Sequence, residues 1–174
     1  MRISPVALAA ALAAAAVVAA TASPASAAGA CGYDRHYLQD AVRSSLFGIA
    51  GGRIALARAS SPEVQSLAQR LVGESTGALG STATLAKRLG VPVPGNPDAL
   101  QHWQLNVVSG LSGSTFDARY AWLESAQLSV AVQDATEAAR LGCSKQVRTH
   151  ATARAKLLRA ELRLSTAAQR ALKG

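Results

Sequence analysis

The sequence predicts an all-α fold, an up-down four-helix bundle with a short extra helix between the second and third long helices. Aromatic residues make up only 4% of the chain, alanine and leucine dominate it, and apolar residues recur at helical spacing. No segment shows the long apolar–polar alternation that is typical of strands. At roughly 25 to 30 residues, each long helix would extend about 40 Å. Helices are expected at about residues 34–59, 61–89, 96–108, 115–141 and 144–172.

Glycines are frequent in the first predicted helix, whereas the second has clear limits. Gly48, Gly51 and Gly52 lower helix propensity, and they either let a neighbouring helix approach closely or mark a kink. In the second helix, Ser61 can act as the cap and Gly90 can end it. The apolar residues expected on the buried face of the first helix are Leu38, Val42, Ile49 and Leu56.

The connection after the second helix contains three prolines between residues 91 and 97, which fix φ and remove backbone donors. A helix cannot continue there, and Asn96 or Asp98 can cap the short helix that follows. Gly142 can end the third long helix, and Ser144 can cap the last one. The apolar residues expected on the inward faces of these last two helices are Phe116, Tyr120, Leu123, Val130, Ala138 and Leu141, followed by Val147, Ala151, Ala155, Leu158 and Leu162.

The N-terminus has the features of a secretory signal peptide. A low-charge apolar run from Val6 to Ala20 is followed by Pro24 and by small residues up to a cleavage site after Ala27. The run, of about 15 residues, is shorter than the ~20 that a membrane span needs. We therefore expect residues 1–27 to be removed and residues 28–174 to form one domain. The mature protein is expected to be secreted or held at the cell envelope, without a transmembrane span.

The two cysteines of the chain, Cys31 and Cys143, are expected to form a disulfide in an oxidising compartment. One precedes the first helix and the other follows the third long helix, and we expect an up-down bundle to place both at the same end. Lipid attachment at Cys31 is disfavoured, because the usual large aliphatic residue three places earlier is missing. The chain has no Cys-x-x-Cys pair, and neither cysteine has a nearby histidine that would favour a zinc site.

The sequence argues against two kinds of enzyme. The segment from Gly73 to Gly77 matches the G-x-S-x-G pattern of serine hydrolases, but it lies in a predicted helix with no sheet around it. A di-iron bundle needs Glu-x-x-His on two helices, and no glutamate lies three places before His36, His102 or His150. We predict no catalytic residues, no cofactor and no metal ligand set, and a non-enzymatic role is favoured.

Several polar side chains fall on or beside the predicted inward faces. Because buried polar groups need partners, these side chains could form a hydrogen-bonded layer inside the bundle. One interpretation of the layer is a structural network, and the other is a remnant or atypical ligand site. The residues are Glu74, Ser75, Gln127, Asp134 and His150.

The last helix carries a strip of basic residues. Without Arg2, which belongs to the signal peptide, 17 basic residues remain against 10 acidic ones, a net charge of +7. Lys156, Arg159, Arg163 and Arg170 recur along one side of this helix and could bind anionic wall polymers, lipid headgroups or nucleic acid by charge. The alternative is a solvated face without a partner. Specific nucleic-acid binding is not expected, because the aromatic residues that would stack on bases are dispersed.

Leu111-Ser112-Gly113 followed by Phe116-Asp117-Ala118-Arg119-Tyr120 resembles a bacterial exported family of unknown function, as does His150 early in the last helix. That family is often labelled a predicted outer-membrane protein and is placed among ferritin-like helical bundles. The resemblance implies a ferritin-like bundle, and the label indicates export rather than insertion into the membrane. Family members usually carry an Asp-His pair where this chain has Glu74-Ser75, and a further histidine near Gln127 to Ser129. These departures weaken any metal function that the fold implies.

The sequence therefore predicts a secreted or cell-envelope bundle with a binding or structural role and with no known ligand. One alternative is a metal-binding or redox protein with a reduced site formed by His150, Glu74 and Asp134. Another is a basic module that binds an anionic wall polymer or lipid headgroups through its last helix.

Overall fold

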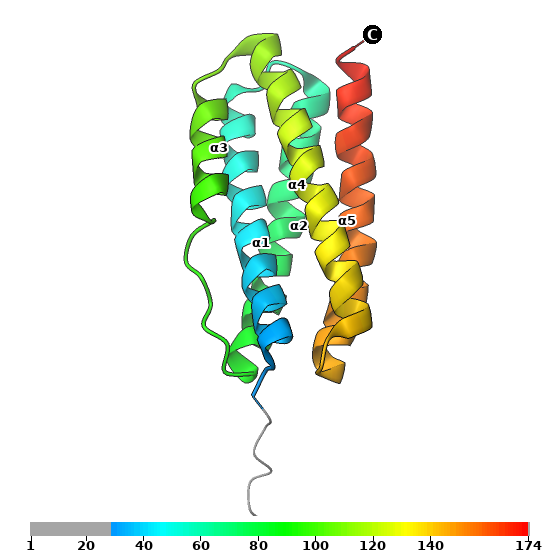
Figure 1. Cartoon of the computed structure of the whole chain (residues 1–174). Helices are drawn as coiled ribbons and strands as arrows, with labels where there is room; N and C mark the ends of the chain where they lie inside the picture. The colour runs from blue at the N-terminus through cyan, green and yellow to red at the C-terminus, as the bar shows by residue number, and fades with distance from the viewer. Residues whose placement is uncertain (1–28, 174) are drawn as a thin grey trace, which may run out of the picture.

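The computed structural model describes residues 29–173, which form five helices and no strand (Figure 1). The four long helices are α1 (Gly32–Arg58), α2 (Pro62–Arg88), α4 (Gly113–Leu141) and α5 (Lys145–Ala171), and α3 (Ala99–Ser109) is short. The predicted all-α bundle with a short helix between the second and third long helices is confirmed. The predicted signal peptide, residues 1–27, lies outside the described residues.

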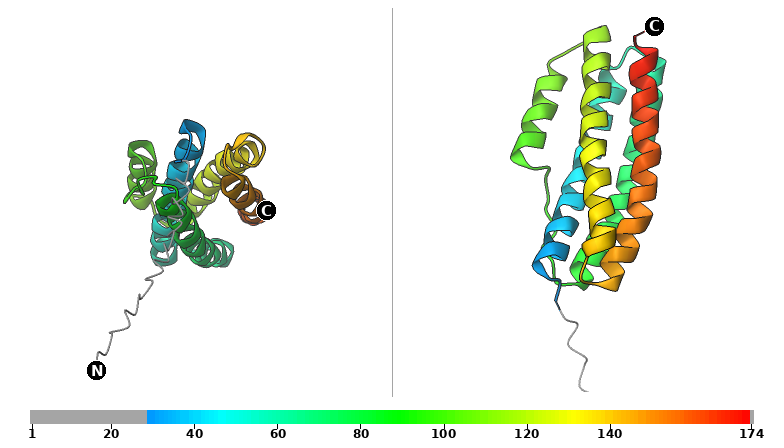
Figure 2. Two further views of the ribbon diagram at one scale, coloured as in Figure 1. Left: turned by 90° about the horizontal axis from the view of Figure 1, so that it is seen from below. Right: turned by 45° about the vertical axis from the view of Figure 1, so that its right-hand side comes forward.

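The long helices form two antiparallel hairpins, α1 with α2 and α4 with α5, which pack against each other. Counting α3, the five helices alternate in direction, so that α1, α3 and α5 run upward in Figure 1 while α2 and α4 run downward. α3 lies outside the four long helices, beside α1 and α4 (Figure 2). The return of the chain through α3 brings the α4–α5 turn to the end where α1 begins. Alternation of the long helices alone would have placed this turn at the other end. The expectation that a plain up-down bundle brings Cys31 and Cys143 together is therefore corrected: the cysteines do pair, but the return through α3 brings them to the same end.

The helix limits follow from their capping residues. The Ser61 hydroxyl accepts the first free backbone N–H groups of α2, and Gly90, with φ of 66°, follows the end of that helix. α3 begins at Ala99, later than expected, because Asp98 is its cap rather than Asn96. The Asp98 carboxylate and the Gln101 side chain form a reciprocal capping box, which satisfies two backbone donors at that end.

The glycines of α1 allow close contact between helices. A Cβ atom at Gly48 would lie 2.5 Å from Ser75 Oγ, and one at Gly52 would lie 2.6 Å from Val72 Cγ2, both on α2. These distances are too short for real side chains, so the α1–α2 packing depends on glycine at both positions. Because α1 is helical throughout its 27 residues, close approach is the better of the two interpretations.

The core of the bundle contains small residues as well as large ones. Three residues that the apolar pattern placed inside are exposed: Leu56 (47%), Val130 (54%) and Leu141 (47%). Near Leu56, α1 buries Gly52 and Ala55 instead, because close helix contacts favour small side chains. Within the described residues, no helix combines the length and the apolar character needed to span a bilayer.

Candidate functional site

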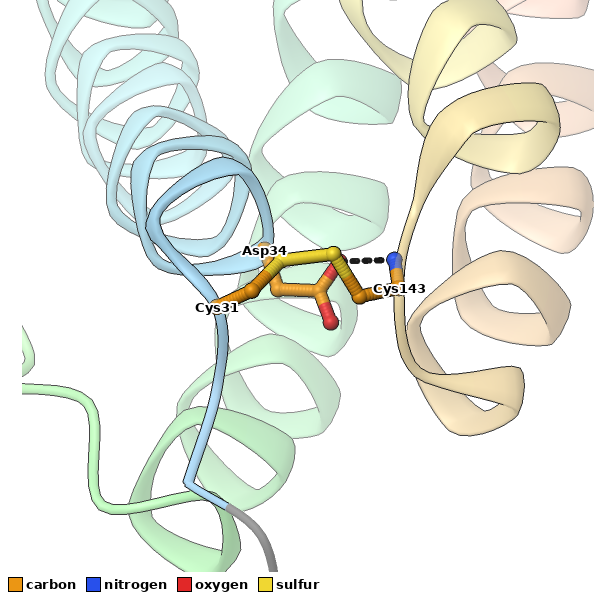
Figure 3. Close-up of side chains that lie close together, drawn as sticks. All are labelled: Cys31, Asp34 and Cys143. Carbon is orange, nitrogen blue, oxygen red and sulfur yellow. Dashed lines mark hydrogen bonds between the residues drawn. A yellow bond between two sulfur atoms is a disulfide. The ribbon is translucent and has the colours of Figure 1, made fainter.

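A disulfide and a buried carboxylate close one end of the bundle (Figure 3). The disulfide joins Cys31 to Cys143, 112 positions apart. The fully buried Asp34 accepts hydrogen bonds from the backbone N–H groups of Cys143 at 2.9 Å and Ser144 at 2.8 Å. Among residues 29–173, Cys31, Asp34 and Cys143 alone bring three potential metal-ligating atoms within 4.8 Å of one another. Because the sulfurs are bonded to each other and thiolates are the metal-binding form, this group is a structural clamp.

A second buried aspartate performs the same task for the other hairpin. Asp117 of α4 accepts the backbone N–H groups of the α1–α2 turn at 3.1 and 2.8 Å. Asp34 and Asp117 each lie three residues before a buried tyrosine, Tyr37 and Tyr120, and Phe116 stacks on Tyr120 with 5.7 Å between ring centroids. The two hairpins therefore share an Asp-x-x-Tyr pattern, and each aspartate holds the turn of the opposite hairpin. The α4 residues that carry the family resemblance, Phe116, Asp117 and Tyr120, are therefore buried and make contacts that stabilise the fold.

His150 of α5 links three helices. Its Nδ1 lies 3.3 Å from the Tyr37 hydroxyl of α1, and its Nε2 lies 3.2 Å from Thr82 Oγ1 of α2. Burial, with a smaller contribution from the charge of Arg154, lowers the pKa of His150 and favours the neutral ring. Both ring nitrogens are occupied by hydroxyl groups, so His150 offers no free nitrogen to a metal ion.

The other residues expected inside the bundle do not gather around His150. Asp134 is exposed, and Glu74 is half-buried and pairs with Arg70 at 3.2 Å. The Gln127 side chain donates a hydrogen bond of 2.9 Å to a glutamine of α3. Of the expected interior residues, Ser75 is buried, but Asp134 is exposed and does not belong to an interior layer. Asp134 and Gln127 lie on the side of α4 that meets α1 and α3.

The polar layer that the structure does bury consists of other residues. Arg154 and Glu161 of α5 form an ion pair of 3.3 Å, and their side chains are 7% and 4% exposed. Burial raises the pKa of Glu124 on α4 to about 8; the neighbouring Tyr120 hydroxyl opposes this shift and the charge of Glu161 adds to it. Within the described part of the chain, Glu124 Oε1 and the Tyr120 hydroxyl lack a well-aligned hydrogen-bond partner. Glu124 is accordingly protonated at neutral pH.

This layer fits neither a di-metal centre nor a serine hydrolase. It contains two carboxylates, Glu124 and Glu161, and the second is already paired with Arg154. Such a centre needs a carboxylate from each of two helices and two Glu-x-x-His pairs. Ser75, in the G-x-S-x-G match, is buried in the middle of α2 against Gly48, whereas a nucleophile elbow exposes its serine at a strand-to-helix turn.

One sequence signal could have located the charged pair. Arg154 and Glu161 lie seven residues apart, one full heptad, on the buried face of α5, so two residues of opposite charge occupy the same heptad position. The apolar residues that share this face are Val147, Ala151, Leu158 and Ala168.

The basic strip, defined as Lys156, Arg159, Arg163 and Arg170, is exposed along α5. The three arginines contribute to the lining of a shallow hollow of about 480 Å³, and Arg159 donates a hydrogen bond of 2.9 Å to a threonine of α4. The single carboxylate of α5, Glu161, is buried. The strip is therefore a row of cations without an exposed carboxylate on its own helix.

The sequence pattern of a domain of unknown function, DUF4142, matches residues 19–167. The chain belongs to this family. No protein with a curated description matches this DUF4142 chain. Among solved structures it is similar to the crystal structure of a DUF305 fragment from Deinococcus radiodurans, with 17% identity and a TM-score of 0.71, over 81% of this chain and 97% of that chain. At this identity the likeness shows a shared helical-bundle fold.

DUF4142 membership agrees with the resemblance to a family of unknown function that the segment from Phe116 to Tyr120 indicated. It assigns no reaction, ligand or location. The function of this DUF4142 chain has to be inferred from its own surface and interior.

Proposed function

We propose that this protein is an exported, non-enzymatic binding protein that attaches to a linear anionic polymer of the cell envelope through the basic strip of α5. The observation that carries the proposal is the charge of that helix. α5 exposes the four residues of the strip and also Lys145, while Glu161 is buried. A row of exposed cations with no carboxylate on the same helix attracts a polyanion.

The length of the strip favours a polymer over a bilayer. From Lys156 to Arg170 the helix rises about 21 Å, at ~1.5 Å per residue, so several charges of an extended polymer could lie along it. Membrane-surface helices bury an apolar face beside their basic residues. α5 exposes two leucines, Leu157 and Leu164, and neither lines the hollow of the strip. Leu164 borders a different hollow, shared with α2 residues such as Leu67.

Export is supported by two independent features. The N-terminal run from Val6 to Ala20, followed by small residues, is typical of a signal peptide. The Cys31–Cys143 disulfide is the kind of bond that persists in oxidising compartments and is rare in the cytosol.

A non-enzymatic role is supported by the state of the interior polar groups. His150 has hydroxyl partners on both nitrogens, Arg154 is paired with Glu161, and Glu124 is 2% exposed. General acid–base catalysis requires a titratable group within reach of substrate. The buried groups described here hold helices together, so we assign partner binding to the exposed charges of α5.

The proposal can be tested with long-chain polyphosphate as a defined linear polyanion. Binding is measured by isothermal titration calorimetry for the parent, for a variant without the four charges of the strip, and for a control variant. The control loses an equal number of positive charges from α1 and α2. Replacing the strip should weaken binding at least tenfold, and the control should stay within about threefold of the parent. The strip variant is K156Q/R159Q/R163Q/R170Q, and the control is R35Q/R53Q/K87Q/R88Q.

Sedimentation with phosphatidylglycerol vesicles separates the two anionic partners. We expect polyphosphate to bind more tightly than vesicles of equal phosphate content at physiological salt. Equal losses for the strip and control variants would show that net charge alone drives binding and would contradict the assigned surface. Tight vesicle binding with no polymer binding would assign the strip to lipid headgroups and overturn the polymer proposal.

A further inference from the structure

The short helix α3 exposes a row of large apolar side chains. Leu100, Trp103 and Val107 follow one another at helical spacing, which places them on one face of α3. Their exposed fractions are 62%, 59% and 40%. The exposed Val130 of α4 extends this surface, since it lines the same cleft as Leu100. These four residues are called the α3 patch below.

The other flank of α3 fixes the direction in which the α3 patch points. Leu105 and Val108 are buried, and Leu105 Cδ2 lies against α1, 3.2 Å from where a Cβ at Gly51 would be. On the side toward α4, the Gln101 side chain donates a hydrogen bond of 3.4 Å to Gln127. Contacts with two helices therefore hold α3 in one rotation about its axis, and this rotation leaves the α3 patch on the outside.

The size of the α3 patch matches the needs of a protein–protein contact. At ~250 Å² for a fully accessible tryptophan, Trp103 alone exposes roughly 150 Å². The four side chains together expose roughly 400 Å², a size at which apolar patches mark interaction sites. A standard interface buries about 800 Å² per partner, of which slightly more than half is apolar. The α3 patch therefore supplies most of the apolar area of one such interface.

The distribution of charge favours a second copy of the chain as the partner. The net charge of +7 expected for the mature chain makes most orientations of two copies repulsive. Among the five helices of residues 29–173, α3 alone contains no Asp, Glu, Lys or Arg. Two copies can therefore approach each other through α3 with the least repulsion between like charges.

The two ends of α3 carry opposite charges. At its start, Asp98 and Asp134 are exposed, and no ion pair of the described residues involves either; Arg43, which shares their cleft, is already paired with a carboxylate of α1 at 2.9 Å. At its end, the exposed Arg58 donates a hydrogen bond of 3.5 Å to the carbonyl of Leu111. In an antiparallel pair of α3 helices, the acidic start of one helix lies beside the basic end of the other.

We propose that two copies of this chain pair through α3 about a two-fold axis, with the α3 helices antiparallel and Trp103 of each copy near the axis. Because Trp103 lies near the middle of the row, the two-fold axis sets Leu100 of one copy against Val107 of the other and the reverse, as a self-complementary interface requires. A tryptophan at the centre of an interface is the type of residue that carries much of the binding energy.

The pairing is independent of the basic strip. α3 packs on α1 and α4, whereas α5 packs on α4 and α2 at the other side of the bundle (Figure 2). A pair formed through α3 therefore leaves both basic strips accessible, and its test does not depend on polymer binding.

The test is sedimentation equilibrium of the purified protein at about 1 to 500 μM, without a polyanion that would bridge copies. We expect a single monomer–dimer equilibrium with a dissociation constant below about 100 μM. Trp103→Ala should raise this constant at least tenfold. Trp122→Ala is the matched control: this tryptophan is 49% exposed on α4, in a hollow shared with Leu172 of α5, and its loss should change the constant by less than about twofold. Because both tryptophans are exposed, circular dichroism should show an intact fold in both variants.

A charge reversal tests the antiparallel arrangement. Arg58→Glu should raise the dissociation constant at least threefold more than Arg53→Glu. Both changes lower the net charge equally. Arg53 is exposed on a different face of α1 from Gly51, which faces α3, because two residues of a helix turn about 200°.

Four results would overturn the proposal. A monomer over the whole concentration range would exclude the pairing, and equal constants for the parent and Trp103→Ala would exclude this surface. Equal losses in the two tryptophan variants would show non-specific apolar contact. Assemblies that keep growing with concentration would indicate a head-to-tail contact instead of a two-fold one. Equal effects of Arg58→Glu and Arg53→Glu would contradict the antiparallel arrangement.

Discussion

Removing the disulfide should cost this bundle a large share of its stability. In the double variant Cys31→Ser, Cys143→Ser, the unfolded chain regains the freedom that the cross-link removes. For residues 112 positions apart, the chain-entropy relation gives about 5 kcal/mol at 25 °C. Divided by the unfolding entropy of a domain of this size, about 2 cal/mol/K per residue, this loss of free energy lowers the melting temperature by about 15 °C.

The assay is equilibrium unfolding in urea followed by far-ultraviolet circular dichroism. The variant should unfold at a lower urea midpoint and with a larger m-value, because its unfolded state is less compact and exposes more surface. The parent protein treated with a reductant serves as a control and should match the variant. Agreement between the two would show that the serine side chains themselves contribute little.

Asp34 provides a second way to test the same end of the bundle. Its carboxylate still receives the N–H groups of Cys143 and Ser144 when the disulfide is absent, so Asp34→Asn should destabilise both backgrounds by about 1–3 kcal/mol. A decrease of less than about 1 kcal/mol in the unfolding free energy of the double-serine variant would refute the chain-entropy reasoning. It would mean that the unfolded chain keeps the two segments close together without the disulfide.

Three further predictions concern the interior. Gly52→Ala should destabilise the protein by about 1–3 kcal/mol in urea unfolding, because the added Cβ would lie 2.6 Å from Val72 Cγ2. A Cβ at Gly73 would meet no atom within 4 Å, so Gly73→Ala should stabilise by roughly 0.5–1 kcal/mol through higher helix propensity. Equal effects of the two substitutions would contradict the close contact between α1 and α2. Asp117→Asn should cost about 1–3 kcal/mol, since a buried N–H of the α1–α2 turn loses its acceptor, and an unchanged urea midpoint would contradict the clamp. The pKa of Glu124 is about 8 in the fold and 4.5 as the ordinary value, so the unfolded chain loses its proton first and stability should fall, by up to roughly 5 kcal/mol, as pH rises from about 4.5 to 8. Glu124→Gln should remove this fall in a series of urea titrations across that range, and an unchanged pH dependence would contradict the assignment.

Features set by neighbouring residues could be predicted from the sequence. The cap at Ser61, the proline-rich connection before Asp98 and the stop at Gly142 depend on local backbone chemistry, and together they give the number and order of the helices. The pairing of Cys31 with Cys143 was predictable because the chain has two cysteines.

Features set by helix rotation could not be predicted in the same way. Asp134 was expected inside and is exposed, because the face that α4 buries is decided by close contacts such as the one between Gly51 and Glu124. A search for large apolar residues misses a face built from glycine, alanine and charged pairs such as Arg154 with Glu161. The repeated Asp-x-x-Tyr pattern is visible in the sequence, but the contacts of its aspartates could not be predicted from it. They depend on the return of the chain through α3, which brings each aspartate to the turn of the opposite hairpin.

The salt dependence of polyanion binding tests the central claim most directly. If the strip formed by Lys156, Arg159, Arg163 and Arg170 carries the contact, the logarithm of the affinity for polyphosphate should fall with the logarithm of salt concentration with a slope of about −3, from roughly 0.7 per neutralised charge. The strip variant should lose most of this slope, and the control variant with four charges removed from α1 and α2 should keep it. Equal slopes in the two variants would contradict the assignment of binding to α5.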